Sequence, residues 1–227
     1  MLCAKFLVGL GGIVSAIGSY ILPLQGQELR VRYSRSEWIT PGMTLVIEGT
    51  KSVPQISSYG LHCQRRYLLL MLDPDVQIPG TGIQCMVLHW YQPDLVFDCK
   101  KVDPPYLLEP DPDRTPVTFA PYIAPQAPPL SHHRYIFLLF EQPPTYHFPK
   151  CFEHIPPKSM EARGGFDIKV FMQAASLGPP VAINYFFGRL DASKGDDSTP
   201  VPSVTTTSFR SLTCDTGPTG SLAKIQR

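Results

Sequence analysis

The sequence predicts a mainly β protein, built largely of antiparallel strands, with one helix near its C-terminus. Between residues 29 and 190 the apolar residues recur mostly with a period of two, which is typical of half-buried strands. The segment "GGFDIKVFMQAASLGPP" instead has helical spacing and ends at a glycine and two prolines; its apolar residues are Phe166, Val170, Ala174 and Leu177. At 227 residues, 43% of them hydrophobic, the chain can bury one sizeable core. We therefore expect one domain with tails.

The expected strands follow one another along the chain. In "LRVRY", Leu29, Val31 and Tyr33 alternate with arginines, as in a half-buried strand. The longer runs "RYLLLMLDPD", "QCMVLHWY" and "RYIFLLFEQ" are continuous and rich in branched and aromatic residues. Pro74 is expected to stop the first of these runs, because proline cannot donate to a strand ladder. After the helix, "VAINYFF" is the last expected strand.

The two ends of the chain do not look like core. Lys5 precedes an apolar run that lasts to about Leu24, with small residues near Gly18, and this pattern predicts a signal peptide over residues 1–22 and a secreted protein. The mature chain would then begin between Ser19 and Gln27. An uncleaved membrane anchor and a buried helix are the alternatives for this segment. Residues 23–190 are the expected domain, and residues 191–227, rich in Ser and Thr, form an expected disordered tail.

Charge and cysteine content limit the class of protein. Twenty basic and nineteen acidic residues leave a net charge of +1, so we expect no nucleic-acid partner. Residues 93–118 are acidic and proline-rich, which predicts a long connection that is either a functional surface loop or a mobile one. No C-x-x-C spacing occurs, which argues against a structural zinc site. Beyond the expected signal the cysteines are odd in number, so at least one lacks a partner within the chain, and the sequence assigns no pairing: Cys63, Cys85, Cys99, Cys151 and Cys214.

Several polar side chains stand at the ends of the expected strands. Alternation along a strand places His133 and Tyr135 on one face, and Asp73 and Asp75, on either side of Pro74, are expected to face the same way. His89 is expected on the opposite face of its strand from Trp90. If these strand ends meet at one edge of a sheet, two carboxylates, two imidazoles and a phenol share a small cavity.

This set of side chains has several interpretations. The residues could simply be satisfied core and rim groups, with "DPD" a turn. A metal site of Asp73, His89 and His133 lacks the short ligand spacing of most mononuclear sites, and neither Ser131 nor Cys85 has the surroundings of a nucleophile. We therefore predict no metal, no cofactor and no catalytic residue. The remaining interpretation is an anion pocket, in which the imidazoles donate to phosphate or carboxylate and an aspartate orients them.

Four segments in order, "LLLMLDPDV", "VLHWY", "APPLSHHRYIFLLFEQP" and "FDIKVFMQAASLGPPVAINYF", resemble the phosphatidylethanolamine-binding protein family. That family includes Raf kinase inhibitor protein, plant flowering regulators and a fungal carboxypeptidase inhibitor. The resemblance spans about residues 29–190 and implies an antiparallel β-sandwich with a pocket for phosphate-like head groups. Position by position it implies these ligand-binding residues: Asp73, Asp75, His89, His133 and Tyr135.

The sequence differs from the family pattern at two places near the expected pocket. Residues 76–78 read Val-Gln-Ile where the family usually has Ala-Pro-Ser. Residues 128–132 read Pro-Pro-Leu-Ser-His, without the two glycines that the family has before its H-R-Y motif. Such glycines let backbone amides approach an anion closely, so their loss would reshape the pocket. His132 alternates away from His133 and is expected to face solvent.

Three functions from different classes follow from these observations. The leading one is a non-enzymatic binding protein for a phosphate-bearing or other small anionic ligand, such as a phospholipid head group. The first alternative, implied by the resemblance, is an inhibitor of a serine carboxypeptidase, which would then be a protein partner. The second alternative is a hydrolase that uses the Asp/His cluster.

Overall fold

The computed structural model describes residues 28–34, 36–78, 84–98, 100, 106–114, 120–126, 131–156 and 160–191. The expected signal peptide lies outside these residues, as does the expected tail apart from Asp191. Within the described ranges, no helix has both the length and the apolar character that crossing a membrane requires.

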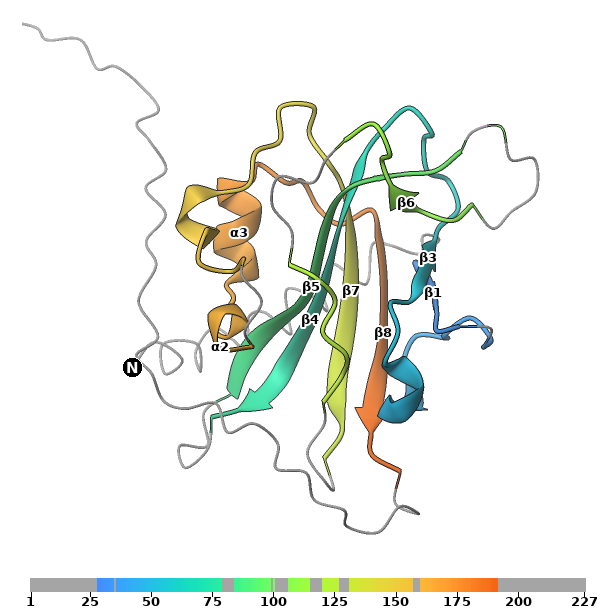
Figure 1. The fold of residues 1–227 in the computed structure, drawn as a ribbon, viewed down its shortest axis with the longest axis vertical. Coiled ribbons are helices and arrows are strands. Elements are labelled where there is room, and N and C mark those ends of the chain that lie inside the picture. Colours follow the sequence, from blue (N-terminus) through green and yellow to red (C-terminus); the bar gives the residue numbers. More distant parts are fainter. Residues whose placement is uncertain are drawn as a thin grey trace, which may run out of the picture.

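A six-stranded sheet forms the centre of the domain, with the strand order β2-β8-β7-β4-β5-β6 (Figure 1). Its neighbouring strands pair antiparallel, apart from β2 and β8, which are parallel. A smaller sheet consists of β1 paired antiparallel with β3. The strands are β1 (Arg30–Arg32), β2 (Met43–Val46), β3 (Gln55–Ser57), β4 (Tyr67–Gln77), β5 (Gln84–Val96), β6 (Glu109–Pro110), β7 (His133–Glu141) and β8 (Ala182–Arg189). The predicted mainly β fold is confirmed.

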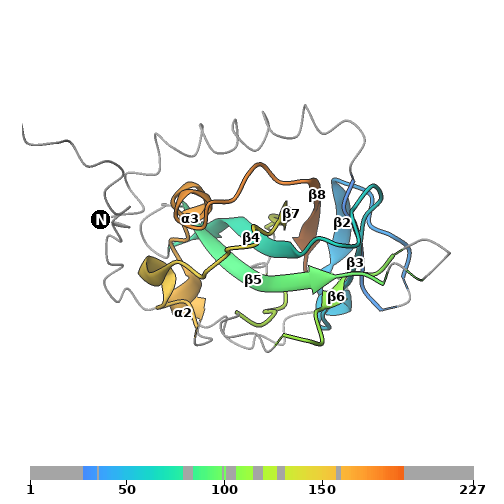
Figure 2. The same cartoon turned by 90° about the horizontal axis from the view of Figure 1, so that it is seen from above.

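The central sheet separates two hydrophobic cores, because successive side chains of a strand point to opposite faces. On one face, Leu68 and Leu70 of β4 pack with Phe171 and other residues of the helical side. On the other face, Leu69 of β4 packs with Val31 of β1 and with further residues of the small sheet. Figure 2 shows the helices on one side of the central strands and the small sheet on the other. The second core joins the two sheets, as in a β-sandwich.

The helices lie on one side of the sheet. These helices are α2 (Met160–Arg163) and α3 (Ile168–Ala174). The chain also contains two short 3-10 helices, η2 (Ile47–Thr50) and η3 (Lys150–Phe152). Asp167 caps α3, because its carboxylate accepts from the backbone N–H groups of Lys169 and Val170. The buried residues of this segment are Ile168, Phe171 and Ala175. The predicted apolar face of the helix is therefore only partly confirmed. Phe166 is buried as predicted, whereas Val170 and Leu177 are only partly buried.

Two register shifts in the pairing of β4 with β5 determine where the polar residues at the strand ends lie. Pro74 does not stop β4 as expected, because the pairing with β5 shifts register between Asp73 and Val76 and the strand continues to Gln77. A second shift leaves His89 as an extra residue of β5, since Met71 pairs with Trp90 while Leu72 pairs with Leu88.

Two of the three described cysteines form disulfide bonds. Cys63 and Cys151 are each disulfide-bonded. Cys85 is buried on β5, where its sulfur accepts from the backbone N–H of Gly165 at 3.0 Å. Cys99 and Cys214 lie outside the described residues.

Candidate functional site

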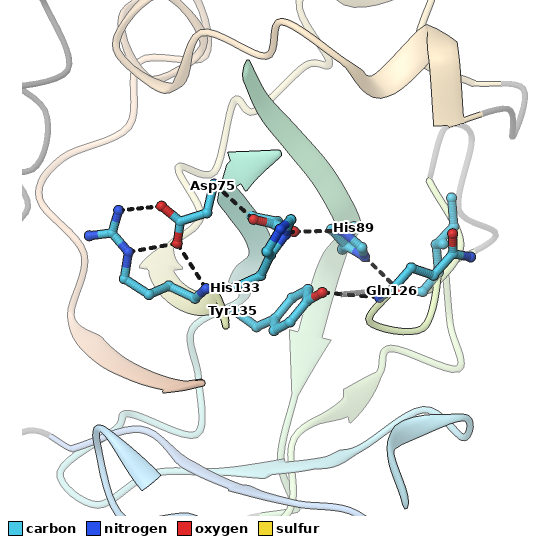
Figure 3. Close-up of polar contacts among 8 residues, drawn as sticks. Asp75, His89, Gln126, His133 and Tyr135 are labelled. Carbon is cyan, nitrogen blue, oxygen red and sulfur yellow. Dashed lines mark hydrogen bonds and ion pairs between the residues drawn. The ribbon is translucent and has the colours of Figure 1, made fainter. Parts of the chain in front are cut away.

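The site is built around the carboxylate of Asp73, near the end of β4. Figure 3 shows three other side chains of the site, His89, His133 and Tyr135. Asp73 is completely buried. Its Oδ2 accepts from Nδ1 of His133 at 2.8 Å, and its Oδ1 accepts from the backbone N–H of Asp75 at 2.9 Å. A buried carboxylate is tolerated only when it is hydrogen-bonded or paired, and Asp73 has both kinds of partner.

His133 is the first residue of β7 and is 5% exposed. Burial of its ring favours the neutral form, but the hydrogen bond and charge of Asp73, together with the charge of Asp75, raise the pKa of His133 above its ordinary value. The hydrogen bond occupies Nδ1, so Nε2 is the nitrogen that remains for a ligand. His133 is therefore the group of this site that most readily carries a positive charge.

His89 has the opposite protonation preference. Complete burial lowers the pKa of His89, and the charge of Asp73 does not fully offset this effect. Its Nδ1 lies 2.9 Å from the backbone oxygen of Ile123 and donates to it. Its Nε2 lies 3.9 Å from Oδ2 of Asp73, too far for a hydrogen bond, and is buried without a partner in the described structure. His89 is thus neutral near pH 7, and its Nε2 carries a lone pair.

The bulge of β5 brings Trp90 to the same face of the strand as His89. The ring of His89 packs edge-on against the ring of Tyr135 at 5.2 Å, and Tyr135 and Trp90 both belong to the core between the two sheets. The expectation that His89 and Trp90 point to opposite faces is therefore wrong. The extra residue in β5 removes the regular alternation at this point.

Tyr135 is the buried phenol of the site, beside His89. Its ring is completely buried and stacks on Phe186 of β8, and its hydroxyl accepts from the backbone N–H of Gln126 at 3.0 Å. Burial and the charge of Asp73 raise the pKa of Tyr135, so the phenol stays protonated at physiological pH. A Cβ atom at Gly188 would come within 2.6 Å of this ring, so the glycine makes room for it. No sequence pattern pointed to Gly188.

Asp75 does not add its carboxylate to the cluster. Arg134 donates to Oδ1 of Asp75 from Nη2 at 2.6 Å and to Oδ2 from Nε at 2.8 Å, and its backbone N–H also reaches Oδ2. The expectation that the carboxylates of Asp73 and Asp75 face the same way is wrong, because the register shift after Asp73 turns Asp75 toward Arg134. The backbone of Asp75 still contacts Asp73, and a ligand contact by Asp75 stays a prediction.

The family-specific differences are only partly visible. His132 is exposed, which confirms the expectation that it faces solvent. Of residues 128–132, the segment without the family glycines, residues 128–130 lie outside the described ranges. Among the described residues, no three His, Cys, Asp or Glu side chains are placed to hold a metal ion.

The arrangement thus joins four predicted residues: Asp73, His89, His133 and Tyr135. It pairs one protonatable imidazole with a buried carboxylate and sets one neutral imidazole and one phenol beside them. Such a site can donate hydrogen bonds to an anion and accept one from it. Backbone partners of the site, at Ile123 and Gln126, come from a connection that has no sequence pattern pointing to this role.

Comparisons with known proteins agree with this description. A family model described as phosphatidylethanolamine-binding protein matches residues 27–186. The "Phomoidride biosynthesis cluster protein N" of Talaromyces stipitatus is 32% identical over 169 residues, which cover 70% of this chain and 82% of that protein. A protein of the same name from another fungal species is 43% identical over 120 residues, which cover 53% of this chain and 51% of that protein.

A solved structure shares the fold. The carboxypeptidase Y inhibitor, solved in complex with its cognate proteinase, aligns with 73% of this chain and 84% of its own chain. The TM-score is 0.52 and the sequence identity is 20%, so this likeness concerns the fold alone.

Proposed function

The chain belongs to the phosphatidylethanolamine-binding protein family, and from this premise we propose that it binds a phosphate-bearing or other small anionic ligand without acting as an enzyme. We assign the ligand site to Asp73, His89, His133 and Tyr135. A phospholipid head group is one ligand of this class. No metal or cofactor takes part in the proposed binding.

The observation that carries this proposal is the buried pair of His133 and Asp73. Their 2.8 Å hydrogen bond keeps the imidazole in a fixed orientation and raises the pKa of His133. The protonated ring then presents Nε2–H to an incoming anion. A charge-assisted hydrogen bond of this kind contributes about 1.5–3 kcal/mol in proteins.

Calorimetry with glycerophosphoethanolamine tests the proposal. Replacing His133 with Ala should weaken binding by roughly ten- to a hundredfold, since one charge-assisted hydrogen bond is lost. The matched control is His132→Ala, because His132 is the exposed neighbour and has no place in the site. A wild-type protein that does not bind, or equal affinities for wild type and His133→Ala, would refute the proposed site.

The pH dependence has a definite sign. Because the protonated His133 donates to the anion, affinity should fall as the pH rises through the pKa of His133 in the complex. A bound anion raises that pKa further, so the fall occurs above the pKa of the free protein. Titrations between about pH 5.5 and 8.5 cover the ordinary histidine range and the upward shift.

The relatives favour a second class of ligand. Two similar fungal proteins are named for the phomoidride biosynthesis cluster, so an anionic small molecule of a biosynthetic pathway is a second candidate for the same site. A screen of anionic metabolites against head-group analogues separates the candidates. Binding of soluble metabolites with no response to glycerophosphoethanolamine would favour the metabolite.

Inhibition of a serine carboxypeptidase is a weaker alternative, supported only by the fold shared with carboxypeptidase Y inhibitor. A carboxypeptidase Y activity assay with increasing amounts of this protein tests it. Undiminished activity at saturating concentrations would exclude inhibition of that protease. Hydrolysis by the Asp/His cluster is tested in parallel with phosphate and carboxylate esters.

Secretion is proposed as well. The two disulfide-bonded cysteines, Cys63 and Cys151, support it, because such bonds persist in oxidising compartments. A membrane-anchored form would contain the uncleaved N-terminal segment.

A further inference from the structure

The side chain of Arg163 has two buried polar atoms without a partner. Across the described residues, the buried side-chain nitrogens and oxygens that lack a hydrogen-bond partner are Nε2 of His89, Nε and Nη2 of Arg163, Oε2 of Glu48 and Oγ of Ser57. Arg163 donates from Nη1 to the backbone oxygen of His89 at 3.1 Å, so these two residues are in contact. Buried polar groups are nearly always paired, and a cluster of unpaired ones indicates a missing partner such as a ligand or water.

The fold fixes the place of Arg163 at the edge of β5. Arg163 ends α2, and the next residues pair with the strand: Gly164 bridges Val87, and the backbone N–H of Phe166 donates to the oxygen of Met86. A second segment joins the same edge, where the backbone N–H of Ile123 donates to the oxygen of His89.

The guanidinium lies where these two segments meet. Its Nη1 donates both to the oxygen of His89 and, at 2.6 Å, to the oxygen of Pro121. Both carbonyls accept from the same nitrogen. Nε and Nη2, on the opposite edge of the guanidinium, therefore have no hydrogen-bond partner among the described residues.

The charge of Arg163 is not neutralised by the described residues. Arg163 is 1% exposed and forms no ion pair with a described carboxylate. Burial lowers the pKa of Arg163 to about 10, so the side chain is still protonated at pH 7. A buried, unpaired cation is unfavourable, and an anion beside it would remove this cost.

The free edge of the guanidinium has the shape that a carboxylate fits. Nε–H and Nη2–H point the same way and can donate to the two oxygens of one carboxylate. The same protein contains this geometry elsewhere, since Arg134 uses its Nε and Nη2 on the two oxygens of Asp75. We propose that Arg163 is a second anion-binding residue, which holds the carboxylate of a small ligand through Nε–H and Nη2–H.

This carboxylate site is independent of phosphate binding at His133, so the two proposals can fail separately. Acetate is the probe, because it is a small carboxylate that can enter a buried site, and acetamide is its uncharged control. In a ¹⁵N NMR titration of the wild-type protein, acetate should shift the Nε–H signal of Arg163, whereas acetamide at the same concentration should not. Sodium chloride at matched ionic strength controls for screening.

The variant Arg163→Lys keeps the charge but loses the two-pronged geometry, and it should weaken acetate binding by about tenfold or more. Arg65→Lys, at an exposed arginine, is the matched control and should bind acetate like the wild type. The NMR titration needs only the wild type, so it stays decisive even if Arg163→Lys folds poorly. An Arg163 signal unmoved by acetate would show that only water fills the site. Acetate binding unaffected by Arg163→Lys would place the carboxylate elsewhere. Either result overturns the proposal. Glycerophosphoethanolamine binding, measured on the same samples, reports on His133 separately.

Discussion

The charge of Asp73 should control the protonation of His133, and Asp73→Asn tests this directly. The amide has nearly the same shape as the carboxylate, and its oxygen can still accept the hydrogen bond from Nδ1 of His133. It carries no charge, and its NH2 group cannot accept from the backbone N–H of Asp75. Hydrogen bonds to charged groups contribute about 1.5–3 kcal/mol and neutral ones about 0.5–1.5 kcal/mol, so the variant loses about 1–1.5 kcal/mol for the protonated ring. This corresponds to a fall of about one unit in the pKa of His133.

The effect on stability has a definite direction. The pKa of His133 in the folded protein is raised, so its contribution to stability is fully present below the unfolded-state pKa and is lost as the pH rises through the folded-state pKa. Asp73→Asn should therefore reduce the free energy of unfolding more at about pH 5.5 than at about pH 8, which lie on either side of the ordinary histidine pKa. His89 loses the support of the same charge, which acts in the same direction.

NMR titration of the histidine ring signals and urea denaturation at both pH values measure these effects. Asp113→Asn, at an exposed carboxylate, is the control and should change neither quantity appreciably. A His133 that titrates below 6.5 in the wild type, or whose pKa is unchanged in Asp73→Asn, would show that Asp73 does not hold the protonated imidazole.

Three further predictions concern the support of the site and the ends of the chain. Gly188→Ala should destabilise the protein by about 1–3 kcal/mol because the new Cβ meets the ring of Tyr135, whereas Gly49→Ala, with nothing within 4 Å, should have little effect in the same denaturation assay. Asp167→Ala should cost about 0.5–2 kcal/mol through the lost cap of α3, while Asp167→Asn should keep most of it; equal losses in both variants would contradict the capping role. Mass spectrometry of culture medium should find a chain that begins between Ser19 and Gln27, and an intact N-terminus confined to the membrane fraction would contradict secretion.

The long strands could be predicted because their apolar runs are read directly from the sequence. β4, β5, β7 and β8 each contain a run rich in apolar, branched and aromatic residues, which is typical of a buried strand. The strands β2, β3 and β6 were not predicted, since they have only two to four residues and are formed by pairing with distant segments. Their existence is a property of the assembled sheets rather than of local sequence.

The site was predictable in composition but not in geometry. Asp73 and His133 meet because regular alternation holds in β7 and in β4 up to Asp73. Trp90 and Asp75 depart from the expected faces because register shifts in β4 and β5 cannot be seen in a single sequence. Arg163 was not singled out at all, since its surroundings come from residues 120–123 and from β5, which are far from it in the chain.

The protonation states of the site determine which ligands it can prefer. A protonated His133 contacts the carboxylate of Asp73 and His89 is neutral, so the charge of His133 is offset and the three groups do not attract an anion by charge alone. An anion gains from the hydrogen bond of His133 but is opposed by the carboxylate of Asp73 beside it. A ligand that also carries a proton would fit better than a fully ionised one, because that proton could be donated to the unpaired Nε2 of His89. We therefore expect an acid with one ionised oxygen and one hydroxyl, such as a singly protonated phosphate monoester, to bind more tightly than glycerophosphoethanolamine, a diester whose phosphate only accepts hydrogen bonds.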